Sequence, residues 1–267
     1  MTNKILTSSK NPLIKQIRKL HRSKERQKQD LLLLEGTNLI RAACETDYSL
    51  ETVCYTPQWQ ENYPQLWQEI ENKAERLELV SIEVLQSIAT TVNPDGIVAT
   101  APRKTRQTPQ VDTTKLGLAI ERLQDPGNLG TIIRTAVASG VDGLWLSEDS
   151  VGFDNPKVLR ASVGEWFKLP MAIDCNLKQI ITAHQQQGLQ IVATSPQATK
   201  TYWSIDYNRP TLILLGNEGA GLSTELAALA QEQIKIPLMS GVESLNVAIS
   251  AALILYEVRR QQIEKAI

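Results

Sequence analysis

The most restrictive feature of the sequence is the alternation of short, largely apolar runs with helical patterns over residues 115–267. Strands that are buried on both faces have this composition, and helices that connect them in alternation favour a mainly parallel sheet. Such sheets bind ligands at the carboxyl ends of their strands. The expected strands are 116–120, 143–146, 189–193, 211–215 and 234–236, and the expected helices are 129–139, 155–163, 177–186, 225–230 and 245–263.

Residues 1–101 predict a smaller α/β unit, and residues 102–114 predict a linker. The linker sequence, PRKTRQTPQVDTT, has two prolines and no apolar run. Residues 115–267 then form the second domain, and a chain of 267 residues suits about two domains. In the first unit we expect a helix starting at Asn11-Pro12, helices at 37–44 with a Thr37 cap and at 66–76, and strands at 31–34, 53–55 and 96–100.

Charge is distributed unevenly along the chain, although its net value is only −1. Residues 1–30 contain nine Lys and Arg residues and two acidic ones, whereas residues 45–83 contain nine acidic residues and two basic ones. A basic arm on a nearly neutral protein favours docking onto a polyanion such as RNA. A solvated helix face explains such a run equally well.

Several functional classes are disfavoured by composition. No apolar run has the roughly 18 residues that a membrane span needs. The N-terminal sequence has no apolar signal core, so we expect a cytoplasmic protein. The cysteines Cys44, Cys54 and Cys175 show no metal-binding spacing, and His21 and His184 are the only histidines. We therefore expect reduced thiols and no metal site.

The first segment with chemical potential is DPGNLGTIIRTA, residues 125–136, which follows an expected strand. Pro126-Gly127 is typical of a bend, and Asn128 is a candidate helix cap. Arg134 lies among apolar neighbours, where an arginine is costly unless it faces a cleft or an anion. Arg134 is thus a candidate anion-binding residue.

The second segment is LLGNEGAGLS, residues 214–223, in which an expected strand runs into a loop with three glycines. Glycine lets the backbone approach a ligand closely. The order of the glycines matches neither the dinucleotide fingerprint nor the P-loop. A glycine loop alone is a weak functional signal, and the carboxylate of Glu218 in the middle of the loop strengthens it.

The third segment is IKIPLMSGVESLNVA, residues 234–248, where a strand leads through a loop into a long helix. Ser244 is a candidate cap at the start of that helix, with Asn246 inside the first turn. Small residues at 248 and 250–252 indicate close packing, within the core or against a second subunit.

Together, NLGTIIRTA, LLGNEGAGLS and IPLMSGVESLNVAISAA resemble, in order and spacing, the SpoU (TrmH-like) family of RNA ribose 2′-O-methyltransferases, within the SPOUT superfamily. The stretch SSKNPLIKQIRKL…LLLLEGTNLI is similar to the family's substrate-binding domain, which has a ribosomal-protein-like α/β fold. The resemblance implies S-adenosylmethionine as methyl donor, a C-terminal trefoil knot and a homodimer. It also implies an RNA substrate, with 23S ribosomal RNA favoured over transfer RNA.

The resemblance also implies roles for individual residues. Its catalytic positions correspond to Arg134, Asn128, Glu218, Ser244 and Asn246. Its cofactor-binding positions correspond to Thr194, Gly216, Asn217, Glu218, Ile236, Leu238, Leu245 and Asn246. The candidate RNA-binding residues, taken from the basic arm, are Lys10, Lys15, Arg18, Lys19, Arg22, Lys24 and Arg26.

Methyl transfer to a 2′-hydroxyl needs an in-line approach and loss of the hydroxyl proton. An arginine is a poor general base because its pKa lies above about 12. We therefore expect Arg134 to hold the neighbouring phosphate and lower the pKa of the hydroxyl, with the proton leaving through phosphate or water. Asn128, Ser244 and Asn246 are expected to orient the ribose and Arg134, and Glu218 to fix the cofactor loop or the arginine.

Two other functional classes compete with this interpretation. A non-catalytic RNA-binding protein for ribosome assembly, built on the same fold, predicts loss of the motif residues, and all five are present. A nucleotide oxidoreductase requires a glycine fingerprint after the first strand, and the sequence has none. A methyltransferase acting on transfer RNA remains the nearest alternative.

Overall fold

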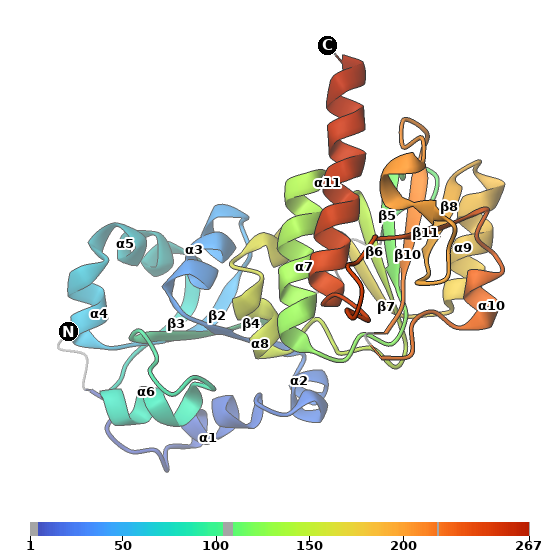
Figure 1. Cartoon of the computed structure of the whole chain (residues 1–267). Coiled ribbons are helices and arrows are strands. Elements are labelled where there is room, and N and C mark those ends of the chain that lie inside the picture. The colour runs from blue at the N-terminus through green and yellow to red at the C-terminus, as the bar shows by residue number, and fades with distance from the viewer. Residues whose placement is uncertain (1–4, 104–108, 218, 267) are drawn as a thin grey trace. The chain divides into compact units, whose positions relative to one another are not determined.

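The computed structural model describes residues 5–103, 109–217 and 219–266. Contacts divide the chain into two compact units, each a sheet covered by helices (Figure 1). The first unit holds the described residues up to 103 together with residues 153–168, and the second holds residues 109–152 and 169–266. Part of the expected linker, residues 104–108, lies outside the described residues.

The first unit is a four-stranded sheet with the strand order β1-β4-β2-β3. Its outer pair β2 and β3 is parallel, whereas β4 runs antiparallel to both β1 and β2. Figure 1 shows helices α1 and α6 on one side of this sheet and α3 and α5 on the other. The strands are β1 (Leu31–Glu35), β2 (Leu50–Tyr55), β3 (Ala74–Leu79) and β4 (Ile97–Pro102), and the helices are α1 (Pro12–Lys19), α2 (Ser23–Gln29), α3 (Thr37–Glu45), α4 (Pro57–Asn62), α5 (Pro64–Lys73) and α6 (Ile82–Ile88).

Local sequence explains how α1 begins. The side chain of Asn11 accepts a hydrogen bond from the Leu13 N–H at 2.9 Å, and Pro12 occupies the first helical position, where its missing N–H costs nothing. Ile14 and Ile17 then face the sheet and pack with Leu33 and other buried residues of the same core. The predicted start of this helix is confirmed.

Residues 153–168 return from the second half of the sequence to the first unit, where they form α8 (Pro156–Ala161) and the short helix η1 (Glu165–Phe167). Asp154, which is buried, binds Arg26 at 3.3 Å and Arg103 at 3.1 Å. Arg160 binds the buried carboxylate of Glu35 at 3.0 Å. A buried carboxylate needs a charged partner, so these pairs fasten the segment to the first unit. The contacts therefore group residues 153–168 with the first unit, whereas the sequence predicted one continuous second domain at 115–267.

The second unit is a seven-stranded sheet with the order β7-β6-β5-β10-β8-β11-β9, and every neighbouring pair is parallel. The predicted mainly parallel sheet is therefore confirmed. The strands are β5 (Leu116–Ile120), β6 (Gly143–Ser147), β7 (Met171–Cys175), β8 (Gln190–Thr194), β9 (Lys200–Thr201), β10 (Thr211–Leu215) and β11 (Glu232–Lys235).

Helices cover both faces of this second sheet. On one face, α9 packs Leu177 and Ile181 against Trp145, Ile191 and Leu212. Figure 1 shows α7 and α11 side by side on the other face, and the two helices contact each other. The helices are α7 (Pro126–Ser139), α9 (Leu177–Gln186), α10 (Thr224–Ala227) and α11 (Val247–Ala266), with the short helix η2 (Tyr202–Ser204).

Two local predictions in the fold were wrong, and two strands were missed. The predicted helix at 66–76 ends at Lys73, because the following residues form the edge strand β3, whose exposed charged side chains imitate an amphipathic helix. Thr37 is the first residue of α3 rather than its cap; Gly36 takes the cap position, and the Thr37 hydroxyl donates to Asp95 at 2.7 Å. Strands β7 and β9 were not predicted.

Candidate active site

The first motif forms the N-terminal half of α7. Asp125 caps this helix, because its carboxylate accepts a hydrogen bond from the Asn128 N–H at 2.8 Å, and Pro126 occupies the first turn. The interpretation of Asn128 as the cap was wrong. The amide side chain of Asn128 therefore does not cap this helix.

That side chain joins the first motif to the third. Asn246 Nδ2 donates a hydrogen bond to Asn128 Oδ1 at 2.9 Å, across 118 residues of sequence. The other end of the Asn246 amide, Oδ1, accepts from the N–H groups of Ala248 at 2.9 Å and Ile249 at 3.4 Å. Asn246 is thus the cap of α11 and a partner of Asn128 at the same time. Two of the predicted residues meet directly.

Ser244 does not cap α11, as the sequence suggested. The helix begins at Val247, and Ser244 lies three residues earlier in an exposed loop. A serine two residues before the cap position is out of reach of the helix's free N–H groups. No hydrogen bond of the Ser244 side chain is found within the described residues, so its hydroxyl faces solvent.

Arg134 lies on α7, six residues after Asn128. Its neighbours Ile132, Ile133 and Ala136 are buried, whereas Arg134 itself is exposed. Within the part of the chain that the structure describes, its guanidinium has no ion pair, and no hydrogen bond joins it to another predicted residue. An arginine presented in this way on a packed helix is available to an anion.

The second motif is a tight loop at the end of β10. Asn217 organises it: its Oδ1 accepts from the N–H groups of Gly219 at 2.9 Å and Ala220 at 3.0 Å, and its Nδ2 donates to the Arg122 carbonyl at 2.8 Å. The backbones of Asn217 and Gly221 also exchange two hydrogen bonds. Glu218 lies outside the described residues.

Glycine is required at position 216. A Cβ atom there would lie 2.1 Å from the backbone of Gly221 and of Leu222, which no rearrangement of side chains can relieve. Gly221 has a φ of +67°, which favours glycine for a different reason. The glycines of this loop therefore let two stretches of backbone lie against each other.

The carboxyl ends of β5, β8, β10 and β11 share one edge, because these strands are parallel neighbours. Thr194 ends β8 and donates to the Leu214 carbonyl at 3.2 Å, while Gly216 follows β10 and Ile236 follows β11. Ile236 and Leu245 are half-buried, and Leu238 is exposed. The predicted cofactor-binding positions on these strands thus gather at the edge where parallel sheets bind ligands.

This edge also holds two residues that were not predicted, Glu121 and Arg122, which follow β5. Glu121 Oε2 accepts from the Ser223 N–H at 2.7 Å. Arg122 has a φ of +55° and donates to the Gly221 carbonyl at 3.4 Å, and its Nε is buried without a hydrogen-bond partner in the described structure. The available signal was a charged pair placed directly after an apolar strand.

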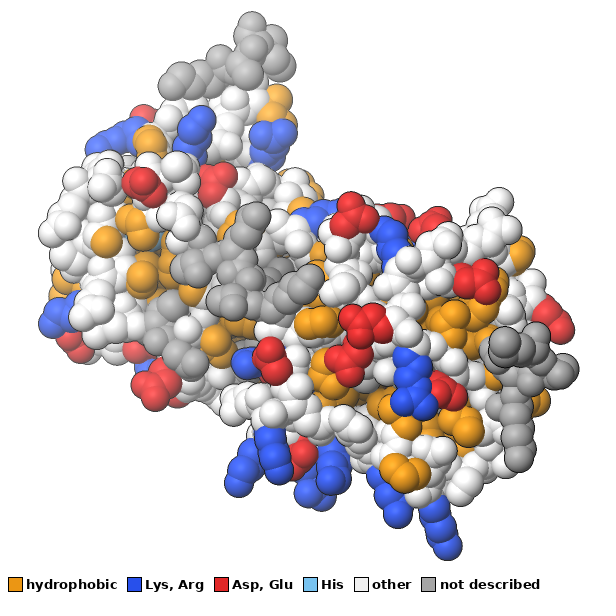
Figure 2. Space-filling model, turned by 180° about the vertical axis from the view of Figure 1, so that it is seen from behind, with side chains coloured by type: hydrophobic (Ala, Val, Ile, Leu, Met, Phe, Trp, Pro, Cys, Tyr) orange, Lys and Arg blue, Asp and Glu red, His pale blue; other side chains and the backbone are white. Residues whose placement is uncertain are grey.

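The basic arm belongs to α1, α2 and the residues before and between them. Figure 2 shows Lys and Arg side chains gathered at the lower margin of the view, the level at which Figure 1 places these two helices. Arg26 differs from the others: it is 3% exposed and paired with Asp154, so it is not available to a phosphate. The exposed candidates are Lys10, Lys15, Arg18, Lys19, Arg22 and Lys24.

Among the described residues, no cluster of three or more His, Cys, Asp or Glu side chains is arranged to hold a metal ion. No helix in that part of the chain has the length and apolar character for crossing a bilayer.

Residues 115–256 match the SpoU rRNA Methylase family, and residues 11–99 match the MRM3-like substrate binding domain. The two matches cover the two halves of the sequence in which the motifs and the basic arm lie.

Individual relatives match both halves together. An uncharacterized tRNA/rRNA methyltransferase of Synechocystis is 48% identical over 96% of this chain and 94% of its own length. A 23S rRNA guanosine 2′-O-methyltransferase of Bacillus subtilis is 29% identical over 96% and 99%. The crystal structure of an AdoMet-bound rRNA methyltransferase from Sinorhizobium meliloti, 32% identical, superimposes with a TM-score of 0.84 over 96% of this chain and 97% of that one.

Proposed function

Because this chain belongs to the SpoU rRNA methylase family, we propose that it methylates the ribose 2′-hydroxyl of an RNA, with S-adenosylmethionine as donor and 23S ribosomal RNA as target. The observation that carries the proposal is the hydrogen bond from Asn246 to Asn128. It joins two motifs that the sequence keeps 118 residues apart. The transfer RNA target and the non-catalytic role are less favoured.

The residues at the carboxyl edge fit the cofactor. The side chains of Thr194 and Asn217 hold the loops after β8 and β10 in place by hydrogen bonds, and the buried Nε of Arg122 lacks a partner within the described structure. Ile236, Leu238 and Leu245 offer apolar surface for an adenine ring. When bound, the sulfonium of S-adenosylmethionine supplies an activated methyl group. We assign the same cofactor role to Glu218, Gly216 and Asn246 on the basis of the family motif.

In the proposed reaction, Arg134 binds the phosphate next to the reactive ribose. A guanidinium fork suits the oxygens of a phosphate, and its positive charge lowers the pKa of the neighbouring hydroxyl. A guanidinium is a poor proton acceptor, so Arg134 is not the proposed base. The proton leaves through the phosphate or water.

The paired amides are the positioning element of the site. With Nδ2 of Asn246 committed to Asn128, and Oδ1 committed to the start of α11, the orientation of the Asn246 amide is determined. The second N–H of the Asn246 amide and the Ser244 hydroxyl are groups that can orient a ribose. Positioning of two reactants accounts for up to roughly 7–11 kcal/mol of a barrier.

The first unit is the proposed RNA-binding part. Support comes from the match to a substrate-binding domain and from the six exposed cations on and around α1 and α2. Contacts of this kind position RNA through its phosphates without reading its sequence. Arg26 is left out of the set because Asp154 already satisfies it.

A homodimer built on α11 is part of the proposal. Ile249, Leu253 and Tyr256 lie on one face of this helix and are 51%, 37% and 53% exposed, beside a cavity of about 440 Å³ that Tyr202 also lines. The small residues Ala248 and Ala251 are buried instead. An exposed apolar helix face is typical of an interface between subunits. The mass of the protein in solution tests this part.

The trefoil knot and the cytoplasmic location also remain proposals. The strand order supports a knot, since β10 inserts between β5 and β8, which precede it in the chain. The location follows from the proposed substrate.

The direct test is methyl transfer in vitro. The purified protein is incubated with S-adenosylmethionine carrying a labelled methyl group and with ribosomal or transfer RNA from cells that lack the gene. We expect label in 23S RNA, at a ribose. Label in transfer RNA would select the nearest alternative, and cofactor binding with no labelled RNA would select the non-catalytic role.

A further inference from the structure

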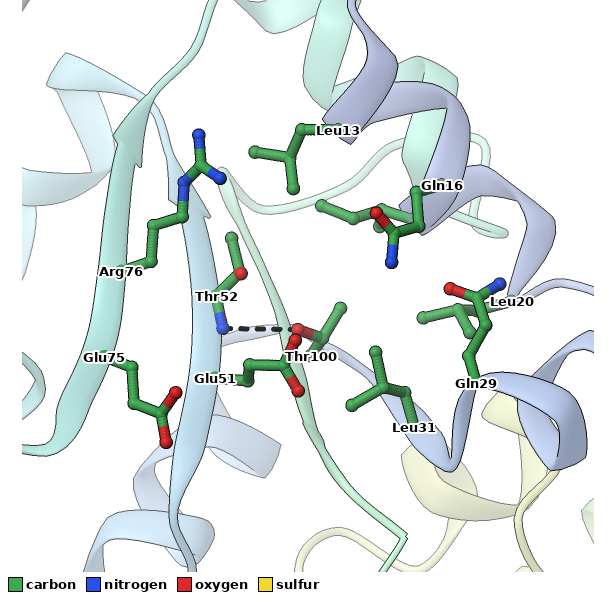
Figure 3. A pocket seen from close by; sticks show the side chains of 11 residues that line it. Leu13, Gln16, Leu20, Gln29, Leu31, Glu51, Thr52, Glu75, Arg76 and Thr100 are labelled. Carbon is green, nitrogen blue, oxygen red and sulfur yellow. Dashed lines mark hydrogen bonds between the residues drawn. The ribbon is translucent and has the colours of Figure 1, made fainter.

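Polar side chains of the two sheets have different kinds of partner. Figure 3 shows a cavity of about 300 Å³ against α1 in the first unit, where the Thr52 N–H donates to the Thr100 hydroxyl at 3.2 Å. That hydrogen bond joins two neighbouring strands. In the second unit, Glu121 and Arg122 follow β5 and bind the glycine loop, which comprises the described residues of 216–223 after β10. Their contacts therefore reach the candidate active site.

The glycine loop is attached to these two residues at its beginning, its middle and its end. Asn217 Nδ2 donates to the Arg122 carbonyl at 2.8 Å, and the Arg122 guanidinium donates to the Gly221 carbonyl at 3.4 Å. Glu121 Oε2 accepts from the Ser223 N–H at 2.7 Å. The shape of the loop is thus set from the end of the neighbouring strand.

The backbone of Arg122 is itself held in an unfavourable conformation. Its φ is +55°, and a residue with a side chain keeps such a conformation only where its surroundings require it. Here the Arg122 N–H donates to Ser147 Oγ at 2.7 Å, and Ser147, the last residue of β6, also contacts Asp149 at 2.6 Å. The anchor of the glycine loop is therefore fixed from a third strand.

The Glu121 carboxylate makes the shortest of the three contacts. Its side chain is 13% exposed, and a hydrogen bond from a backbone N–H to a carboxylate is stronger than one to a neutral oxygen. The N–H that it binds belongs to Ser223, which also caps α10 by accepting from the Leu226 N–H at 3.4 Å. Because glycine leaves a backbone many conformations to lose, a loop of this composition needs such outside contacts to keep one shape.

We propose that Glu121 and Arg122 are positioning residues, which hold the glycine loop of the ligand-free protein in the shape that S-adenosylmethionine binds. The proposal rests on the proposed function, to which the cofactor role of Gly216 and Asn217 belongs. A loop that is already ordered raises affinity, because the ligand need not impose the order. We therefore expect these residues to act on the affinity for the cofactor and not on the rate of transfer once it is bound.

Two substitutions of Glu121 test the hydrogen bond, with S-adenosylhomocysteine binding to the full-length protein measured by calorimetry. Glu121→Leu keeps a side chain of similar volume but removes the acceptor for the Ser223 N–H. Its affinity should fall about tenfold, the lower end of the effect of one hydrogen bond to a charged group. Glu121→Gln keeps an oxygen at this place and should recover most of the lost affinity.

Asp142 offers a matched control at the other end of the same strand. Its Oδ2 accepts from the backbone N–H groups of Lys115 at 2.7 Å and Leu116 at 2.9 Å, just before and at the start of β5. Asp142→Leu therefore removes a carboxylate of the same kind from the same strand. Its thermal stability should fall, whereas its affinity for S-adenosylhomocysteine should stay at the wild-type value.

Two further measurements separate positioning from a general loss of stability. In the ligand-free protein, amide hydrogen exchange at 219–223 should be faster in Glu121→Leu than in wild type, and unchanged in Asp142→Leu. In steady-state methyl transfer, Glu121→Leu should raise the KM for S-adenosylmethionine about tenfold and leave kcat within about twofold, the pattern expected when ground state and transition state lose the same binding.

Equal affinity of the wild-type protein and Glu121→Leu for S-adenosylhomocysteine overturns the proposal. An equal loss of affinity in Asp142→Leu overturns it too, and so does a fall in kcat with an unchanged KM. Methyl transfer to 23S RNA by the wild-type protein tests the proposed function separately, since the calorimetry and the hydrogen exchange are done without RNA.

Discussion

The two units hold their proposed functional residues in different ways. In the second unit, Asn246 and Asn217 each use both ends of their amide groups, one end on a nearby backbone and the other on a distant segment. In the first unit, the exposed cations Lys15, Arg18 and Lys19 lie on the outer side of a two-turn helix. One arrangement determines orientation, and the other supplies charge.

The difference follows from what each task requires. A methyl transfer depends on the distance and angle between reacting atoms, so its side chains need support. Attraction between cations and phosphates acts over about 8–10 Å at physiological salt and tolerates mobile side chains. Arg26 is the exception within the basic arm, since it is buried and holds the first unit together.

The largest effect is expected on stability, when the buried ion pair between Arg26 and Asp154 is broken. Asp154→Ala leaves Arg26 buried without its carboxylate, and such a change costs about 3–5 kcal/mol. The free energy of unfolding of the first unit, followed by denaturant titration, should fall by that amount. Glu71→Ala, at an exposed position of α5, is the matched control and should change little. A similar small change in both variants would show that the buried pair contributes nothing.

The next effect is on catalysis. Arg134→Ala removes the proposed phosphate contact from an otherwise packed helix, and loss of one such electrostatic group costs roughly 100- to 1,000-fold in rate. Arg134 is exposed, so stability should not change, and S-adenosylmethionine affinity should survive. Single-turnover methyl transfer and cofactor titration provide the two measurements. If cofactor affinity is lost instead, Arg134 has been assigned to the wrong step.

A smaller effect separates the two roles of Asn246. Asn246→Asp keeps an oxygen for capping α11 but loses the N–H that reaches Asn128, whereas Asn246→Ala loses both. We expect the Ala variant to lose about 1 kcal/mol of stability and the Asp variant much less. Both should methylate RNA about tenfold more slowly. Full activity in the Asp variant would mean that the bond between the two amides is not needed.

The sequence predicted the central strands of the second unit well, for a physical reason. Residues 116–120 and 211–215 are buried on both faces, so their apolar runs are continuous, and their observed bounds match. Edge strands lack that signal. β3 is exposed on its outer side and was mistaken for the end of a helix.

The candidate site was predictable in composition but not in its connections. Ser244 and Asn246 are both good helix caps, and only the start of α11 at Val247 decides between them. In the same way, a run of lysines and arginines does not reveal that Arg26 has a buried partner 128 residues away. Such choices depend on contacts between distant segments, which local patterns do not contain.

The smallest effect concerns a single residue of the basic arm. Lys19→Gln removes one exposed charge, and each phosphate contact contributes about 0.7–0.9 to the slope of log affinity against log salt. We expect the slope for RNA binding to fall by that amount, with the rate of methyl transfer at saturating RNA unchanged. Lys178→Gln, at an exposed lysine of the second unit's α9, is the control. Because the cations of the arm act by charge alone, Lys19→Arg should restore the slope, whereas a loss that arginine does not repair would indicate a contact as specific as those of the second unit.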